Sequence, residues 1–430
     1  NEYARAAALL EVKTDPVRLA QTLIAESQSL VRTTERRRST SSARRALDIL
    51  ESTNQSPALL AEGHATLARA LHYEGPQLES LEHADRAIML ARTANAPMTI
   101  ANALSTGALA LEKLGRLEEA TNQAVEAANL ARTFDAMRPL DRARLLHNAA
   151  YLLEQSGKAD ESLVLAEESL AIRETHFGKG HPATAAGLGR VAAALRRLNR
   201  LDEAIAIYAH SIEIVSDETP EAFAIRGNAR RHLARTHELV AAKLRDSDLV
   251  SSNEHRDVAI ELYAAAAREL MQGEALTTRV VQSALTARAR AIAARDGFNA
   301  LLDDAKSFPR ELSIMQSKEL AGVPRVAEAH LRAAVVPVIV DARREPKFVA
   351  DQTWIALLRA DLAAVDADPT VDEVLRILVE IGLCEVLRSS PDGRDRAESK
   401  SRAEALVSRA RAVVGERSQI TARCEALVRP

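Results

Sequence analysis

Apolar residues recur along most of the chain at the three- and four-residue spacing that places side chains on one face of a helix. The alternation of polar and apolar residues that strands need is missing. The helical pattern also repeats at a fixed interval, because Gly115, Gly157 and Asn199 occupy one turn position, 42 residues apart both times. The repeating segments span residues 114–131, 156–172 and 198–214. Such a period predicts stacked helical hairpins that bury their apolar faces against their neighbours.

Columns of small side chains follow each of these turns. Five residues after the turn stand Ala120, Ser162 and Ala204, and an earlier copy has Ser80 five residues after Gly75. Small side chains allow two helices to cross at close range, because the ridges of one helix then fit into the grooves of the other. The next columns, at helical spacing, are Ala124, Ala166 and Tyr208, and then Ala127, Ser169 and Ser211.

These units resemble tetratricopeptide repeats of the 42-residue kind found in kinesin light chains and in many bacterial signalling proteins. The match is best at residues 198–214, and Gly180, His181 and Pro182 match the phrase that joins repeats in that subfamily. The resemblance implies an all-α solenoid of stacked antiparallel helix pairs with a right-handed superhelical twist. Divergent terminal repeats are expected, because they must cap the stack with polar faces.

The repeat pattern predicts three regions along the chain. Residues 1–55 form a degenerate N-terminal helical repeat, residues 56–272 form the array, and residues 273–430 form divergent helical repeats and a C-terminal cap. An insertion at about residues 243–255 falls in the last repeat of the array, and insertions in solenoids are expected in loops. Beyond the array, further helices are predicted at residues 323–346, with a kink at Pro337, and at residues 353–369, 370–388 and 397–414.

The segment HFGKGHPATA, residues 176–185, has the appearance of a chemical site, because two histidines flank a turn of glycine, lysine and glycine. A phosphate-binding loop would need a buried strand before it and a Lys-Ser/Thr ending, and neither is present. Glycines past a helix end and Pro182 at a helix start are typical of a linker. We therefore interpret His176 and His181 as linker residues and not as a metal pair, since no third ligand lies nearby in sequence.

We find no sequence signal for catalysis. The motifs of metalloproteases, hydrolases, dinucleotide-binding enzymes and kinases do not occur in a usable context, and paired carboxylates fall on solvated helix faces. We therefore predict no catalytic residue, no cofactor and no metal. Cys384 and Cys424 lie forty residues apart in apolar helical stretches, which predicts buried core thiols.

Charge and hydropathy exclude some classes of partner. The formal net charge of −3 creates no overall field that would attract nucleic acid or an anionic membrane. No apolar run approaches the ~20 residues of a membrane helix, and no signal peptide opens the chain, which predicts the cytoplasm. The most basic stretch, residues 33–45, is interpreted as an exposed linker between helices, with a phosphorylation or docking site as the alternative.

The resemblance also implies where a ligand binds. In the family the first helix of each repeat lines a concave surface, and fixed positions of that helix point into it. Asn148 stands where related proteins carry an asparagine that binds the ligand's backbone, whereas Thr106 and Arg190 depart from that pattern. The implied groove residues are Asn102, Ser105, Arg144, His147, Asn148, Tyr151, Arg190, Arg197, Arg231 and Arg235.

This implied groove is rich in arginine, and guanidinium groups bind carboxylates and phosphates through two parallel hydrogen bonds. We therefore expect a protein or peptide partner with an acidic segment, unless these arginines pair with acidic neighbours within the stack. The expected function is a non-catalytic scaffold or sensor, as the regulatory portion of a larger bacterial signalling protein, and the start at Asn1 agrees with an excised portion. The alternative is an enzyme, or a regulator of one, with its site after residue 310. A pheromone-responsive regulator would need a DNA-binding module, for which there is no sequence signal.

Overall fold

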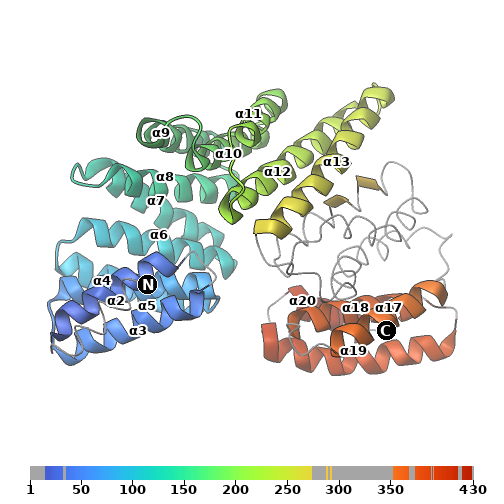
Figure 1. Cartoon of the computed structure of the whole chain (residues 1–430), viewed down its shortest axis with the longest axis horizontal. Helices are drawn as coiled ribbons and strands as arrows, with labels where there is room; N and C mark the ends of the chain where they lie inside the picture. Colours follow the sequence, from blue (N-terminus) through green and yellow to red (C-terminus); the bar gives the residue numbers. More distant parts are fainter. Residues whose placement is uncertain are drawn as a thin grey trace. The chain divides into compact units, whose positions relative to one another are not determined.

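The computed structural model describes residues 15–31, 35–273, 287–288, 291–292, 352–367, 373–388, 390, 392–414 and 419–428. These described residues form α-helices joined by turns and contain no strand. The chain divides into two compact units, Asn1–Ile214 and Val215–Pro430. Figure 1 shows the helices of each unit in chain order. The prediction of an all-α solenoid built from helix pairs is confirmed.

The first unit consists of hairpins, each with a first and a second helix. The first helices are α2 (Pro16–Leu30), α4 (Pro57–Glu74), α6 (Pro97–Lys113), α8 (Pro139–Gln155) and α10 (Pro182–Arg197). The second helices are α3 (Arg36–Ser52), α5 (Gln77–Thr93), α7 (Leu117–Thr133), α9 (Ala159–Phe177) and α11 (Leu201–Glu213). Each first helix packs against the first helices beside it, whereas the backbone of each described second helix of this unit packs closely only against first helices and meets the next second helix through ion pairs such as Arg132–Glu168. The first helices therefore form the inner layer of the stack.

Local backbone chemistry sets the helix boundaries. Each first helix begins with a proline in its first turn, where the missing N–H would have no partner inside the helix. The aligned turn positions are left-handed, with φ of 80° at Gly115, 83° at Gly157 and 64° at Asn199. Glycine adopts this conformation without a steric penalty, and asparagine tolerates it better than other side chains do. The alignment of Asn199 with the two glycines is thus confirmed.

The columns of small side chains lie at the interfaces between helices. Ala120 on α7 is fully buried, and serines occupy the equivalent position on α5 and α9. The Oγ atoms of Ser80 and Ser162 each donate a hydrogen bond over 2.7 Å, to the backbone carbonyls of Ala68 and Ala150 on the preceding first helix. A serine can therefore replace an alanine in this column without leaving its buried hydroxyl unsatisfied.

The basic stretch at residues 33–45 is not an exposed linker, because α3 begins at Arg36 and includes most of it. The Oγ of Ser39 donates to the backbone carbonyl of Ser27 over 2.9 Å, as the equivalent serines of later hairpins do. Arg38 forms an ion pair of 2.6 Å with Glu26, which is buried on α2. The linker prediction is wrong because it was based on the charged residues alone, whereas the small residues between them form the buried face of α3.

For the alternative that this stretch is a phosphorylation site, α3 leaves Ser41 exposed and buries Ser39 and Ser42. Ser39, Ala43 and Ala46 are fully buried and continue the three small columns of the repeat. Ser42 is buried as well, and its Oγ donates to Oε2 of Glu26 over 2.9 Å. A kinase could reach these two buried hydroxyls only if the first hairpin opened.

The second unit contains a hairpin of α12 (Pro220–Leu244) and α13 (Leu249–Gly273), each 25 residues long. The residues that exceed the repeat period lengthen both helices, so the expectation of a looped insertion at residues 243–255 is wrong. The interface between the two helices continues into the added turns, where the Oγ of Ser252 donates to the backbone carbonyl of Ala241 over 2.8 Å. Added helical turns can remain packed when the side chains between the two helices are small and their buried polar groups form hydrogen bonds.

The remaining described helices of this unit are α17 (Gln352–Ala367), α18 (Glu373–Arg388), α19 (Gly393–Val414) and α20 (Gln419–Val428). The predicted helices at residues 353–369, 370–388 and 397–414 correspond to α17, α18 and α19, whereas residues 323–346 lie outside the described residues. Cys384 and Cys424 are buried in one apolar cluster, so the prediction of core thiols is confirmed. Burial raises the pKa of Cys384 to about 12, which keeps this thiol protonated.

Candidate ligand-binding surface

Hydrogen bonds join equivalent or adjacent positions of neighbouring first helices in the first unit. Arg144 on α8 donates through Nη2 to Oδ1 of Asn102 on α6. Nδ2 of Asn148 on α8 donates to Oγ of Ser105 on α6 over 3.0 Å. The structure therefore brings four of the predicted groove residues together. The face of α2, α4, α6, α8 and α10 that carries these and the following polar residues is called the first-helix surface below.

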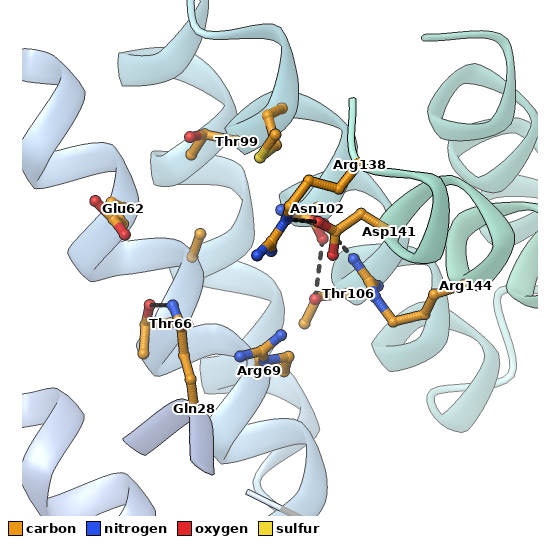
Figure 2. A pocket seen from close by; sticks show the side chains of 12 residues that line it. Gln28, Glu62, Thr66, Arg69, Thr99, Asn102, Thr106, Arg138, Asp141 and Arg144 are labelled. Carbon is orange, nitrogen blue, oxygen red and sulfur yellow. Dashed lines mark hydrogen bonds and ion pairs between the residues drawn. The ribbon is translucent and has the colours of Figure 1, made fainter. Parts of the chain in front are cut away.

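A pocket of about 170 Å³ opens on this first-helix surface, as Figure 2 shows. Four successive first helices supply its walls, so the pocket follows the repeat. Its lining residues are Gln28 from α2; Glu62, Ala65, Thr66 and Arg69 from α4; Met98, Thr99, Asn102 and Thr106 from α6; and Arg138, Asp141 and Arg144 at the start of α8. Nε2 of Gln28 donates to Oγ1 of Thr66 over 3.4 Å, which links α2 to α4.

The pocket contains three guanidinium groups and two carboxylates, a surplus of one positive charge. Nε of Arg138 and Oδ2 of Asp141 lie 2.7 Å apart and form an ion pair at the rim. Glu62 is exposed at the pocket mouth, but the protein crowds its inner side, and this desolvation raises the pKa of its carboxyl group. Charged groups of both signs in one small hollow can orient a polar ligand.

A second charged cluster lies farther along the first-helix surface, around Glu154 on α8. The Glu154 side chain is only 3% exposed, and three arginines of α10 share its carboxylate. Arg197 contacts it most closely, with Nε 2.8 Å from Oε1, whereas Arg190 and Arg196 are each 3.4 Å away. Three cations around one carboxylate leave a surplus of two positive charges in this cluster.

Tyr151 links the Glu154 cluster to α6. Its hydroxyl donates to Oε1 of Glu112 over 3.2 Å, and the guanidinium of Arg190 lies 4.9 Å from the centre of its ring. This distance is within the range of a cation–π contact. Burial, together with the nearby carboxylate of Glu112, raises the pKa of Tyr151 to about 12, so its hydroxyl remains a donor at neutral pH.

The remaining predicted groove residues are divided between the two units. His147 is half-buried on α8 in the first unit, whereas Arg231 and Arg235 lie on α12 in the second unit. Nη2 of Arg231 donates to Oδ1 of Asn228 over 3.3 Å, and Arg235 is exposed. The first-helix surface of the first unit is therefore the one on which the candidate site is built.

The histidines of residues 176–185 lie at a helix junction. His176 belongs to the last turn of α9, which ends just before Gly178 in a left-handed conformation with φ of 83°. Nδ1 of His181 accepts the backbone N–H of Ala183 over 3.1 Å, so this histidine caps the start of α10. Among the residues that the structure describes, there is no group of three or more histidine, cysteine or acidic side chains placed to hold a metal.

The sequence reasoning missed most of the pocket because it transferred the groove positions only to the units from residue 101 onward, and not to the earlier copy around Gly75. Gly75 and Gly115 are 40 residues apart, so the unit that contains α4 is two residues shorter. Transferring positions with this spacing would have identified the pocket residues of α4, which are Glu62, Ala65, Thr66 and Arg69. Asp141 and Arg138 precede Arg144 by about one and two helical turns, at positions that the resemblance did not include.

Comparisons with known proteins agree with the repeat. The family model described as "Tetratricopeptide repeat" matches residues 141–217. No curated protein matches the chain significantly. Among the described helices, none combines the length and the apolar character required to cross a membrane.

Several solved structures are similar to this chain. A Rap protein complexed with Competence and Sporulation Factor is 9% identical over 96% of this chain and 97% of its own, with a TM-score of 0.51. The apo quorum sensor NprR from B. thuringiensis is 10% identical over 90% of this chain and 98% of its own, with a TM-score of 0.49. Repeats of a protein described as a kinesin light chain from Podosopora anserina are 18% identical over 46% of this chain and 95% of their own, with a TM-score of 0.39. At these identities the likeness to the Rap protein shows a shared fold.

Proposed function

Residues 141–217 are tetratricopeptide repeats, and from this premise we propose that the chain binds an acidic peptide or protein segment on its first-helix surface. Arrays of such repeats are generally non-catalytic scaffolds whose extended surfaces bind other proteins. In this proposal the chain acts as a scaffold or sensor in the cytoplasm, as the regulatory portion of a larger bacterial signalling protein.

The observation that carries the proposal is the pocket built by α2, α4, α6 and α8. A concave site with a few convergent polar groups is the usual form of a ligand-binding site. Because each wall comes from a different repeat, a ligand in the pocket would contact four repeats at once. An extended peptide suits such a site, since its successive residues can reach successive helices.

The charges of the first-helix surface favour an acidic ligand. Arg69, Arg138 and Arg144 outnumber the carboxylates of the pocket, and the Glu154 cluster adds a surplus of two positive charges farther along. Guanidinium groups recognise carboxylates with two parallel hydrogen bonds. Arg197 is 40% exposed although it pairs with Glu154, so its guanidinium is accessible to a ligand carboxylate.

The fold likeness to the Rap protein is consistent with a sensor, because that protein was solved in complex with Competence and Sporulation Factor. The similarity covers nearly the whole length of both chains. It supports the class of function, a protein that binds a signalling factor, while the residues of the pocket support the acidic character of the ligand.

The proposal is tested by selecting ligands from a random peptide library displayed on phage, with the full chain as the target. Selected peptides are expected to be rich in Asp and Glu. A labelled peptide is then titrated against wild type, Arg69→Gln and Arg144→Gln. Each variant should bind about tenfold more weakly or worse, because a lost hydrogen bond to a charged group costs about 1.5–3 kcal/mol. Affinity should also fall as salt rises, since ion pairs are screened over ~8 Å at physiological ionic strength.

Arg132→Gln is the matched control for these variants. Arg132 is a partly exposed arginine on α7, and it pairs with Glu168 on α9, so the substitution removes the same charge from the second helices. Its affinity for the peptide should equal that of wild type. Selected peptides without acidic residues, or equal binding by both pocket variants and wild type, would contradict the proposal.

A further inference from the structure

Two hairpins contain a pair of histidines in direct contact across the helix interface. In the α4–α5 hairpin, the Nδ1 atoms of His64 and His83 lie 2.9 Å apart, and the ring centroids are 5.1 Å apart. In the α12–α13 hairpin, the Nδ1 atoms of His237 and His255 lie 2.8 Å apart, and the ring centroids are 5.0 Å apart. Each pair therefore shares one hydrogen bond, in which one Nδ1–H donates and the other Nδ1 accepts.

The first pair is enclosed by three helices. His64 is only 4% exposed, and Oε1 of Glu51 on α3 lies 3.8 Å from its Nε2. This carboxylate favours the tautomer with a proton on Nε2, in which Nδ1 of His64 accepts the hydrogen bond and Nδ1 of His83 donates it. Burial lowers the pKa of His64 to about 4 and also lowers the pKa of His83. The charged groups that act on the pair are Arg44 and Glu51 from α3 and Glu79, Glu82 and Arg86 from α5.

The second pair repeats this arrangement in the other unit. Both rings are half-buried between α12 and α13. Burial is the main cause that lowers the pKa of His237 to about 4, and the neighbouring His255 adds to it. Two helix pairs with different lengths and sequences thus use the same hydrogen bond between imidazoles at their interface.

We propose that the pairs His64–His83 and His237–His255 are acid-sensitive latches, which hold the α4–α5 and α12–α13 hairpins closed at neutral pH and release them on protonation. The hydrogen bond requires that one Nδ1 keep its lone pair. When both imidazoles are protonated, two N–H groups and two positive charges face each other at a distance of less than 3 Å. Separation of the helices relieves this repulsion, because water can then solvate both cations.

The pKa shifts determine the pH range in which the latches act. A free imidazole titrates near ~6.5, and the pKa values of His64 and His237 are about 4 in the closed hairpins. The open state therefore binds more protons between these two values, so stability is fully present above about pH 6.5 and is lost as the pH falls toward 4. Within this window the ratio of closed to open hairpin falls about tenfold per pH unit for each such histidine.

Opening of the first latch would also alter the proposed ligand site. α4 supplies Glu62, Thr66 and Arg69 to the pocket, and His64 lies on the same helix. Separation of α4 from α5 would therefore disturb one wall of the pocket and release a bound peptide in acid. This consequence rests on the proposed function, whereas the latch itself is tested without any ligand.

Hydrogen exchange of the full chain, followed by mass spectrometry from about pH 7 to about pH 5, tests the latches. After correction for the intrinsic exchange rates, the amides of α4 and α5 should lose protection by about tenfold or more relative to α6 and α7. The α6–α7 hairpin is the internal control because residues 97–133 contain no histidine. If the amides of α4–α5 lose no more protection from exchange than those of α6–α7 as the pH falls, the proposal is overturned.

The double variant His64→Asn, His83→Asn separates titration from packing. An asparagine amide replaces Nδ1 and can keep a hydrogen bond, but it does not titrate. In this variant the acid-induced loss of protection in α4–α5 should shrink to the contribution of His72, a half-buried histidine of α4 whose pKa burial also lowers, while α12–α13 should still open in acid through its own intact pair. If the variant does not fold, the ring protons of the wild-type histidines are titrated by NMR. The pKa values of His64 and His237 should then lie well below the ~6.5 of a free imidazole, and values near ~6.5 would refute the latches.

Discussion

The first and second helices of the first unit bury different side chains, although they pair within the same hairpins. The first helices bury leucines, such as Leu71 on α4, Leu111 on α6 and Leu153 on α8. The second helices bury mainly small residues, and on α7 the buried set consists of five alanines and one threonine, although α3 and α11 also bury Leu50 and Tyr208. The difference follows from position, because a first helix packs closely against helices on several sides, whereas a second helix packs closely only against first helices and meets its neighbouring second helices through partly exposed charged side chains.

The ion pairs of the two sets of helices differ in the same way. On the first-helix surface Glu154 is almost fully buried and shared by three arginines. On the second helices, pairs such as Arg132–Glu168 join neighbouring repeats at partly exposed positions. A charged group enclosed by the inner layer therefore needs the opposite charge beside it, because water cannot solvate it there. A charged group on the second helices can be solvated by water when its partner is removed.

The largest expected effect comes from Glu154→Gln. Glutamine keeps the shape of the side chain but leaves three guanidinium groups around a neutral amide, and Arg190 and Arg196 are mostly buried there. Removal of one partner from a buried ionic cluster costs about 3–5 kcal/mol. Urea denaturation of the full chain should therefore show a loss of stability of this order.

Glu168→Gln is the control for that substitution, because it removes the same charge from a pair on the second helices. Its effect should remain below about 1 kcal/mol, as for other exposed ion pairs. Equal losses for the two variants would show that burial does not distinguish the two sets of charges.

An intermediate effect is expected from Ala124→Leu, which enlarges a fully buried position where α7 meets its neighbours. Added methylene groups in a well-packed interface typically cost about 1–3 kcal/mol. Asn122→Leu adds an apolar side chain to the exposed face of the same helix and should change stability by no more than ~0.5 kcal/mol. Thermal unfolding of both variants measures the difference, and a tolerated Ala124→Leu would show that the small column is not required for close packing.

The sequence was sufficient to predict features that depend on the type of residue at one position, such as turns and close helix contacts. A left-handed turn needs glycine or asparagine, so the turn at Asn199 could be located without a structure. Close approach of two helices needs small side chains at helical spacing, so the interface around Ala124 was visible as well. The same rule would have placed Ser39, Ala43 and Ala46 on a buried helix face if the surrounding arginines had been set aside.

The candidate site was harder to predict because its contacts join residues far apart in sequence. Glu154 was assigned no role, since its three arginine partners follow it by 36 to 43 residues on another first helix. Arg190 was expected to face a ligand, and the structure instead places it between Glu154 and Tyr151. The position of a residue in the repeat predicts which helix face its side chain occupies. Whether a charged side chain there forms an ion pair within the stack or remains open to a ligand depends on the residues of the neighbouring repeat.

The smallest expected effect concerns Arg92 and Glu126, which join α5 to α7 over 2.9 Å with about half of each side chain exposed. A double-mutant cycle with Arg92→Gln and Glu126→Gln should give a coupling energy of about 0.2–1 kcal/mol, because the attraction is weak in water and ordering two long side chains opposes it. The coupling should fall further when salt is added, since the Debye length shortens to ~3 Å at 1 M. A coupling above about 2 kcal/mol that persists in high salt would mean that the ion pairs of the second helices stabilise the stack as strongly as the enclosed cluster around Glu154.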